Sequence, residues 1–284
     1  MILLTVVAVT GLGVSIALLT TCMLCTSIDQ LERTSGDLRR RATEIAPYVV
    51  VAAVLFLLKL VTNDLSLVLS ETIDWNVTDT LYAVEGLFVA HLQNLVPDAA
   101  YGFFSVMYMF GFPYLLLVPI VLYFLLPTQN HLKKLFIAYV LNYTVGAISY
   151  TVFIAYGPRN WISEHVNGTM YQLYPETQEL TAAVSDGSDV FPSLHTSMAI
   201  IVLLFAWQTR RAYPRWFNIA AFVSTSVVLS TMVLGIHWVS DVVAGVALGT
   251  WCVVTASWIV ERVDRDSGTN RSVDETSLSS EVDD

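Results

Sequence analysis

Long apolar segments, separated by short polar ones, constrain this chain more than any other feature of its sequence. An apolar stretch of about 20 residues crosses a bilayer as a helix. Seven such stretches cover approximately residues 2–25, 45–65, 101–126, 135–156, 192–208, 217–236 and 239–260. Charged residues make up only 13% of the chain, against about 25% in soluble domains. We therefore predict an all-α, polytopic membrane helix bundle with about seven transmembrane helices.

The positions of Lys and Arg predict how these spans are oriented. Twelve of the fourteen basic residues lie in the alternate segments that follow spans one, three, five and seven. Arg159 lies on the other side, and Lys59 lies within span two. Because cytoplasmic loops carry the positive charge, we expect a cell-membrane protein with its N-terminus outside and its C-terminus in the cytoplasm.

Two sequons agree with this topology. Asn76 and Asn167 each begin an Asn-x-Ser/Thr triplet, and both fall in predicted outer segments. Such triplets also occur by chance, so the sequence does not show whether they are glycosylated.

The two ends of the chain differ in character. The first apolar run has neither a positively charged start nor a small-residue cleavage site, so we expect a retained span. Residues 266–284 are polar and acidic without periodicity, and we predict a disordered cytoplasmic tail there. The transmembrane domain then covers residues 1–265.

The outer segment 70–100 carries an amphipathic pattern. Its apolar residues recur at helical spacing at Leu81, Val84, Phe88, Leu92 and Leu95. The pattern is typical of a helix lying in the membrane interface, or of a short helix packed on the bundle.

Composition excludes one class of partner. The net charge is −10 and no basic stripe is present, so the chain has no surface for nucleic acid. The acidity suggests a salt-adapted source, and an ordinary acidic protein is the alternative. Cys22, Cys25 and Cys252 lie in or at the ends of apolar runs and are expected to be buried small hydrophobic residues.

The start of span five predicts an anion site. Pro192 is suited to the first position of a helix, with Ser188 or Asp189 as its cap. Free backbone N–H groups at such a helix end bind phosphate. Ser193 adds a hydroxyl, and His195 lies one turn into the helix.

A second pair of groups lies between spans six and seven. His237 and Asp241 are four residues apart and share a helix face. A carboxylate there fixes the imidazole tautomer and leaves the other nitrogen free as a nucleophile or base. Because spans five and seven both begin on the outer side, we expect His195 at the same depth as this pair. Ionisable groups within a membrane usually mark function.

Arg159 directly follows span four on the outer side, where cations are unusual. A guanidinium matches a phosphate with two hydrogen bonds, so we expect Arg159 to bind the phosphate of a substrate. The alternative is an arginine that extends to the interface from a span end.

Two segments resemble the second and third signature motifs of the type 2 phosphatidic acid phosphatase superfamily. They are Phe191-Pro192-Ser193-Leu194-His195 and Gly235-Ile236-His237-Trp238-Val239-Ser240-Asp241. Ser230 stands at the position of the third motif's serine, and the spacing of His237 and Asp241 is the usual one. The resemblance covers roughly residues 150–255.

Three positions depart from the usual motifs. Leu194 replaces a glycine, and Thr231 replaces the arginine of the third motif. Of the first motif only Arg159 remains, because Val152 stands at its lysine position and Pro158 precedes the arginine. A second motif of this kind without the third-motif arginine is similar to the inositol phosphorylceramide synthase branch, the inositolphosphotransferases.

The resemblance implies a role for each matching residue. His237 would attack phosphorus and form a phosphohistidine, Asp241 would orient it, and His195 would protonate the leaving oxygen. Ser193 and Arg159 would hold the phosphoryl oxygens. The resemblance also implies a six-helix core, here at about residues 45–260, no metal or other cofactor, and a phospholipid or isoprenoid-phosphate substrate.

Two other functions remain open. In a metal-dependent membrane hydrolase, His195, His237 and Asp241 would bind zinc, with further outer donors at His91, His165, Asp186 and Asp189. In a transporter of the same architecture, Lys59, Asn142 and Tyr143 would line a path through the bundle, although helix–helix hydrogen bonding also explains them. The lipid, the acceptor and the oligomeric state are not readable from the sequence.

Overall fold

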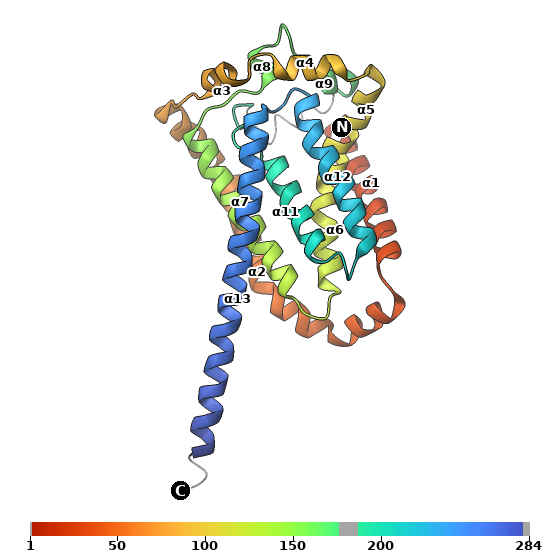
Figure 1. Ribbon diagram of the computed structural model, residues 1–284, viewed down its shortest axis with the longest axis vertical. Coiled ribbons are helices and arrows are strands. Elements are labelled where there is room, and N and C mark those ends of the chain that lie inside the picture. Colours follow the sequence, from red (N-terminus) through yellow and green to blue (C-terminus); the bar gives the residue numbers. More distant parts are fainter. Residues whose placement is uncertain (1, 176–186, 281–284) are drawn as a thin grey trace.

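A computed structural model describes residues 2–175 and 187–280, and the regular structure of these residues is helical apart from two isolated β-bridges. The long helices are α1 (Ile2–Cys25), α2 (Ile28–Ile73), α6 (Phe112–Phe124), α7 (Asn130–Val152), α11 (Leu194–Gln208), α12 (Pro214–Val233) and α13 (Val239–Ser280). The short ones are α3 (Thr78–Glu85), α4 (Phe88–Leu95), α5 (Asp98–Val106), the π-helical turn η1 (Met107–Gly111), α8 (Pro158–Trp161) and α9 (Thr169–Leu173). Figure 1 shows the long helices side by side in one bundle.

The predicted membrane bundle is confirmed. Six helical segments are long and apolar enough to cross a membrane, within α1, α2, α7, α12 and α13 and along the continuous run of α5, η1 and α6. The fifth predicted span is shorter: α11 has 15 residues and packs against α6, α7, α12 and α13. Its expected start at Pro192 is wrong. The helix begins at Leu194, because the Ser193 hydroxyl accepts the backbone N–H of Thr196 at 3.3 Å and caps the helix.

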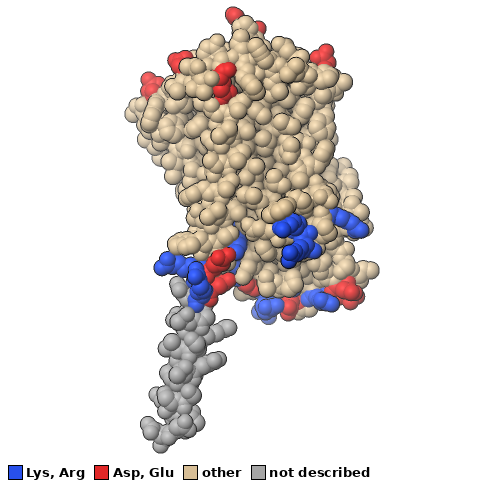
Figure 2. Space-filling view, viewed as in Figure 1, with Lys and Arg blue, Asp and Glu red and all other residues tan. Residues whose placement is uncertain are grey.

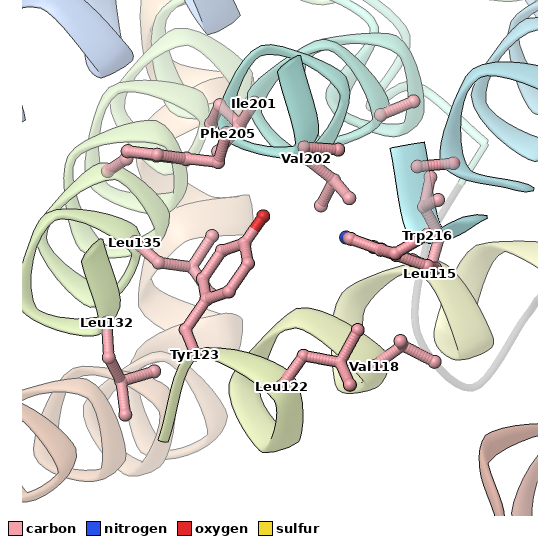
Figure 3. Packing of buried hydrophobic residues seen from close by; sticks show 14 of the residues in the cluster. Leu115, Val118, Leu122, Tyr123, Leu132, Leu135, Ile201, Val202, Phe205 and Trp216 are labelled. Carbon is pink, nitrogen blue, oxygen red and sulfur yellow. The ribbon is translucent and has the colours of Figure 1, made fainter. Parts of the chain in front are cut away.

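The core lies where α6, α7, α11 and α12 meet. Leu115, Leu122, Val202, Phe205 and Trp216 all belong to one fully buried apolar cluster, part of which Figure 3 shows at close range. Burying this surface against protein holds α11 in the middle of the bundle. The helix α1 packs on α6, η1 and α12 from outside, and α2 packs on α7.

Glycines in α13 allow it to pack closely on α11. A Cβ built on Gly245 would lie 2.6 Å from the carbonyl oxygen of Ser193, and one on Gly249 would be closer still to that of Ser197. Only glycine fits such an approach. As a result the N-terminal ends of the two helices meet, and the Ser193 N–H donates to the Asp241 carbonyl at 3.1 Å.

The amphipathic part of the segment 70–100 forms the two short helices α3 and α4 instead of one continuous helix, between the end of α2 and the start of α5. Gly86 breaks it, with a φ of +56° in the left-handed region that glycine adopts without steric cost. Leu81 is buried, whereas Phe88 and Leu95 remain exposed. The segment therefore packs on the bundle with one face and leaves apolar side chains exposed on another. In Figure 1, α3, α4, α8 and α9 lie across the end of the bundle where α13 begins.

Charged side chains separate along the bundle. In the view of Figure 2, Lys and Arg gather at the end where α6 meets α7, and the opposite end shows acidic residues without cations. The side chain of Lys59 lies outside the described part of the chain. The helix α13 runs to Ser280, whereas we predict a disordered tail from residue 266 onward. Residues 281–284 of that predicted tail lie outside the described part of the chain.

Candidate active site

A cavity of about 200 Å³ opens at the end of the bundle that α8 and the start of α11 share. Its lining includes Arg159, His195 and His237, three of the five residues singled out from the sequence. Asp241 and Ser193 lie behind this wall and contact it. The structure therefore brings together side chains from α8, from α11 and from the loop that precedes α13.

The α12–α13 loop holds His237. Its backbone N–H donates to the Thr231 carbonyl at 3.1 Å, and the turn before it needs Gly235, whose φ is +68°. The His237 Nδ1 lies 3.4 Å from Asp241 Oδ2, which is slightly long for a hydrogen bond. The same Oδ2 accepts the backbone N–H of Trp238 at 2.8 Å. Asp241 thus caps its own helix and faces the imidazole from behind.

Burial determines the protonation of His237. The side chain is almost inaccessible to solvent, and burial lowers the pKa of His237 to about 3. The nearby charge of Arg159 lowers this pKa further, while a hydrogen bond to the Val190 backbone opposes the shift. The imidazole is therefore neutral near pH 7, and a neutral ring has a nitrogen lone pair available for attack.

His195 faces His237 across the cavity. The ring centroids of the two imidazoles are 6.4 Å apart. The Tyr108 ring stacks on the His195 ring with their centroids 4.5 Å apart. The Phe112 ring lies tilted against the same imidazole, with the two centroids 4.2 Å apart. The two aromatic rings fix the orientation of the imidazole.

Ser193 is fully buried and acts as the N-cap of α11. Neither Ser188 nor Asp189 takes that position. The Ser193 side chain is not part of the cavity lining, and its oxygen accepts the Thr196 N–H. Its expected contact with a phosphoryl oxygen stays a prediction.

Arg159 extends from α8 towards the cavity. Its Nη2 donates to the Tyr171 hydroxyl at 2.6 Å, and its guanidinium carbon lies 4.4 Å from the centroid of that ring. The other terminal nitrogen, Nη1, is buried and has no hydrogen-bond partner among the described residues. Leaving a buried cationic N–H unpaired is costly, so the group is suited to an anion that enters the cavity.

Several cavity residues were not found from the sequence. Tyr108, Tyr150 and Asn160 also line the cavity, together with Asp189, which the sequence suggested only as a helix cap or a metal donor. Tyr108 belongs to an apolar run that gives no local sign of function. The one structural sign is its place in the π-helical turn η1, because such turns are frequent at functional sites.

Among the described residues, the donors considered for a metal do not form a metal site. No group of three His, Cys, Asp or Glu side chains within residues 2–175 and 187–280 is placed to hold a metal ion. His91 and His165 are exposed and do not line the cavity, and Asp186 lies outside the described residues.

Comparison with known proteins places the chain in a family. The family model described as the PAP2 superfamily matches residues 85–255, more than half of the chain. The chain belongs to the PAP2 superfamily. This confirms the resemblance at the level of the superfamily, a group of phosphatase-type membrane phosphoesterases. The matched residues run from the end of α3 into α13 and include all five predicted site residues.

The chain is also similar in sequence to a curated protein. The chain is 25% identical over 167 residues to an uncharacterised protein of Methanocaldococcus jannaschii, a match that covers 57% of this chain and 63% of that protein. The chain therefore spans less than two thirds of that relative. No solved structure matches the chain significantly.

Proposed function

We propose that this PAP2 protein cleaves a phosphate ester of a membrane lipid, or transfers its phospho-headgroup, through a phosphohistidine on His237. The observation that carries the proposal is the arrangement around the cavity. Two imidazoles face each other at 6.4 Å, a carboxylate supports one of them, and a buried guanidinium N–H is unpaired beside them. Phosphoryl transfer needs such positioning and charge stabilisation above all.

The reaction has two balanced steps. In the first, Nε2 of His237 bonds to phosphorus while the bond from phosphorus to the leaving oxygen breaks. His195, whose protonated form the bound phosphate anion favours, gives that oxygen its proton. Asp241 stabilises the positive charge that develops on the His237 ring. In the second, the oxygen of water or of an alcohol bonds to phosphorus, the P–N bond breaks, and the proton of the acceptor passes to His195. Arg159 neutralises charge on the phosphoryl oxygens in both steps.

The charge of the cavity favours a phosphodiester as substrate. Arg159 is the one Lys or Arg among the described residues that line it. A phosphate monoester carries about −1.5 to −2 at pH 7, whereas a diester carries a single charge. With Arg159 as the one such cation among the described residues and the Asp189 carboxylate also in the lining, the cavity suits the single charge of a diester better than the higher charge of a monoester, which supports the headgroup transferase interpretation that Leu194 and Thr231 suggest.

The distribution of charge supports an extracytoplasmic site. The cavity opens at the bundle end opposite the gathered Lys and Arg side chains (Figure 2). Cytoplasmic loops carry the positive charge in membrane proteins. We therefore propose that the N-terminus and the site face outward and that the C-terminus is cytoplasmic.

The test uses purified protein in detergent with EDTA. Phosphatidic acid and phosphatidylinositol are supplied with and without a diacylglycerol whose acyl chains differ in mass from those of the donor lipids, and lipids and free phosphate are measured by mass spectrometry. His237→Ala is compared with His165→Ala, which removes an exposed histidine outside the cavity. We expect turnover in wild type and His165→Ala, and none in His237→Ala.

The products distinguish the acceptors. Free phosphate from phosphatidic acid identifies a phosphatase, and headgroup transfer that requires diacylglycerol identifies a transferase. Equal turnover in His237→Ala and wild type contradicts the phosphohistidine. Activity that EDTA removes and zinc restores supports the metal-dependent alternative instead.

A further inference from the structure

Glu85 makes a long-range contact with the helix that carries Asp241. It is the last residue of α3, and its carboxylate accepts the backbone N–H of Val239 at 2.7 Å and that of Ser240 at 2.5 Å. These amides belong to the first turn of α13. Glu85 itself does not line the cavity, so it does not reach a substrate there.

Two carboxylates together close the N-terminal end of α13. Glu85 takes the amides of Val239 and Ser240, and Asp241 takes that of Trp238. A helix end with free N–H groups attracts anions, but here those donors are already used by acids of the protein. The helix end that remains to bind a substrate phosphate is therefore the start of α11, which forms part of the cavity wall.

The residues between His237 and Asp241 are held from α3 as well. The Tyr82 ring meets the Trp238 ring edge to face at 6.2 Å, and the Trp238 indole N–H donates to the Tyr156 carbonyl at 2.9 Å. Trp238 is fully buried. The short segment that sets the distance from His237 to Asp241 is therefore fixed on both sides.

We propose that Glu85 is a positioning residue that acts on the reaction through the His237–Asp241 pair. It fixes the first turn of α13 and so keeps Asp241 Oδ2 behind His237 Nδ1. This role rests on the proposed function of that pair.

The experiment compares Glu85→Gln with Asp79→Asn. Asp79 is an exposed acid on the same helix, so its substitution removes the same charge without touching α13. Values of kcat, KM and apparent Tm are measured with the lipid that the wild type turns over. Because a misplacement of about 1 Å costs up to about 100-fold in rate, we expect Glu85→Gln to lower kcat roughly 10- to 100-fold. KM should stay within about twofold, since Glu85 lies outside the cavity.

A double-mutant cycle with Asp241→Asn separates positioning from a general loss of structure. If Glu85 acts through Asp241, Glu85→Gln should change kcat less than about threefold once Asp241 is replaced. Independent, multiplying losses would overturn the proposal, and so would a kcat for Glu85→Gln equal to that of Asp79→Asn.

Two further outcomes are decisive. If Glu85→Gln does not fold, Glu85→Asp is measured instead. Aspartate keeps the charge but reaches the amides less well, so we expect kcat to fall by less than the roughly 10- to 100-fold expected for Glu85→Gln. If neither variant folds while Asp79→Asn does, Glu85 serves folding and the proposal fails. If the wild type turns over lipid no faster than His237→Ala, the proposed function itself is refuted, and the role of Glu85 with it.

Discussion

Leu194 fills the space that the missing side chain of Gly146 leaves on α7. A Cβ built on Gly146 would lie 2.5 Å from Cδ2 and 2.8 Å from Cδ1 of Leu194. In the motif that this segment resembles, glycine stands at the position of Leu194. The larger residue on α11 is therefore matched by the smallest residue on α7, and the wall of the cavity stays closed.

This match predicts strong coupling between the two positions. Gly146→Ala should lower the apparent Tm, because the new Cβ forces Leu194 out of its rotamer. In a Leu194→Ala background the same change should be neutral or stabilising, since it fills part of the space that the leucine vacates. Thermal unfolding of the four proteins measures the coupling, and additive changes in Tm would show that the two residues do not share this space.

Close packing of α13 on α11 predicts that Gly245→Ala is destabilising. The added methyl would meet the Ser193 carbonyl at 2.6 Å, and a backbone atom does not move aside without moving its helix. We expect a loss of about 1–3 kcal/mol, typical of overpacking, together with reduced turnover. Gly11→Ala in α1 is the matched control, because nothing lies within 4 Å of its Cβ. Alanine there should be neutral or stabilising, as alanine is the better helix former.

The geometry of Arg159 predicts unequal effects of two conservative substitutions. Arg159→Lys loses the fork of donors that binds two oxygens of one phosphate, so kcat/KM should fall by about 10- to 100-fold, corresponding to charge-assisted hydrogen bonds of about 1.5–3 kcal/mol. Tyr171→Phe keeps the ring under the guanidinium and loses only the hydroxyl acceptor, and a smaller loss is expected. Steady-state kinetics of both variants decide the order, and a larger effect of Tyr171→Phe would contradict it.

The lowered pKa of His237 predicts an acid-side loss of stability. In the unfolded chain the imidazole takes up a proton near its ordinary pKa of about 6.5, whereas in the folded protein it does so near pH 3. Stability from this residue is thus complete above about pH 6.5 and falls as the pH drops towards 3. Between pH 6.5 and 4.5 the loss is on the order of 2–3 kcal/mol.

Apparent Tm values at pH 7 and 4.5 measure this effect. Wild type should lose more than His237→Gln, which has no imidazole to protonate at this position. An equal loss in the two proteins would show that His237 is not the group responsible.

Topology made the main part of the site predictable. Spans five and seven begin at the same end of the bundle, so His195 and His237 had to lie at one level, and Arg159 stood out as the one basic residue in a predicted outer segment. The fold class followed from the apolar runs in the same way, and the structure confirms it.

Other features depend on contacts that no local pattern encodes. Glu85 meets α13 across 154 residues of sequence, and Tyr108 is hidden in an apolar run. The start of α11 was expected at Pro192, but the helix begins two residues later because the Ser193 hydroxyl caps it. One glycine, Gly86, was enough to divide a stripe of apolar residues into two helices.

The short length of α11 has a consequence for how a lipid meets the site. Fifteen residues extend about 22 Å, and the hydrocarbon core of a bilayer is about 30 Å thick. We place the C-terminal end of α11, which comes just before Arg210 and Arg211, at one boundary of the hydrocarbon core. The N-terminal end of the helix then lies several ångström short of the opposite boundary. On this placement we expect the two histidines to lie beneath the plane of the headgroups. A lipid would reach them by drawing its phosphate down into the protein, with its acyl chains still anchored in the leaflet.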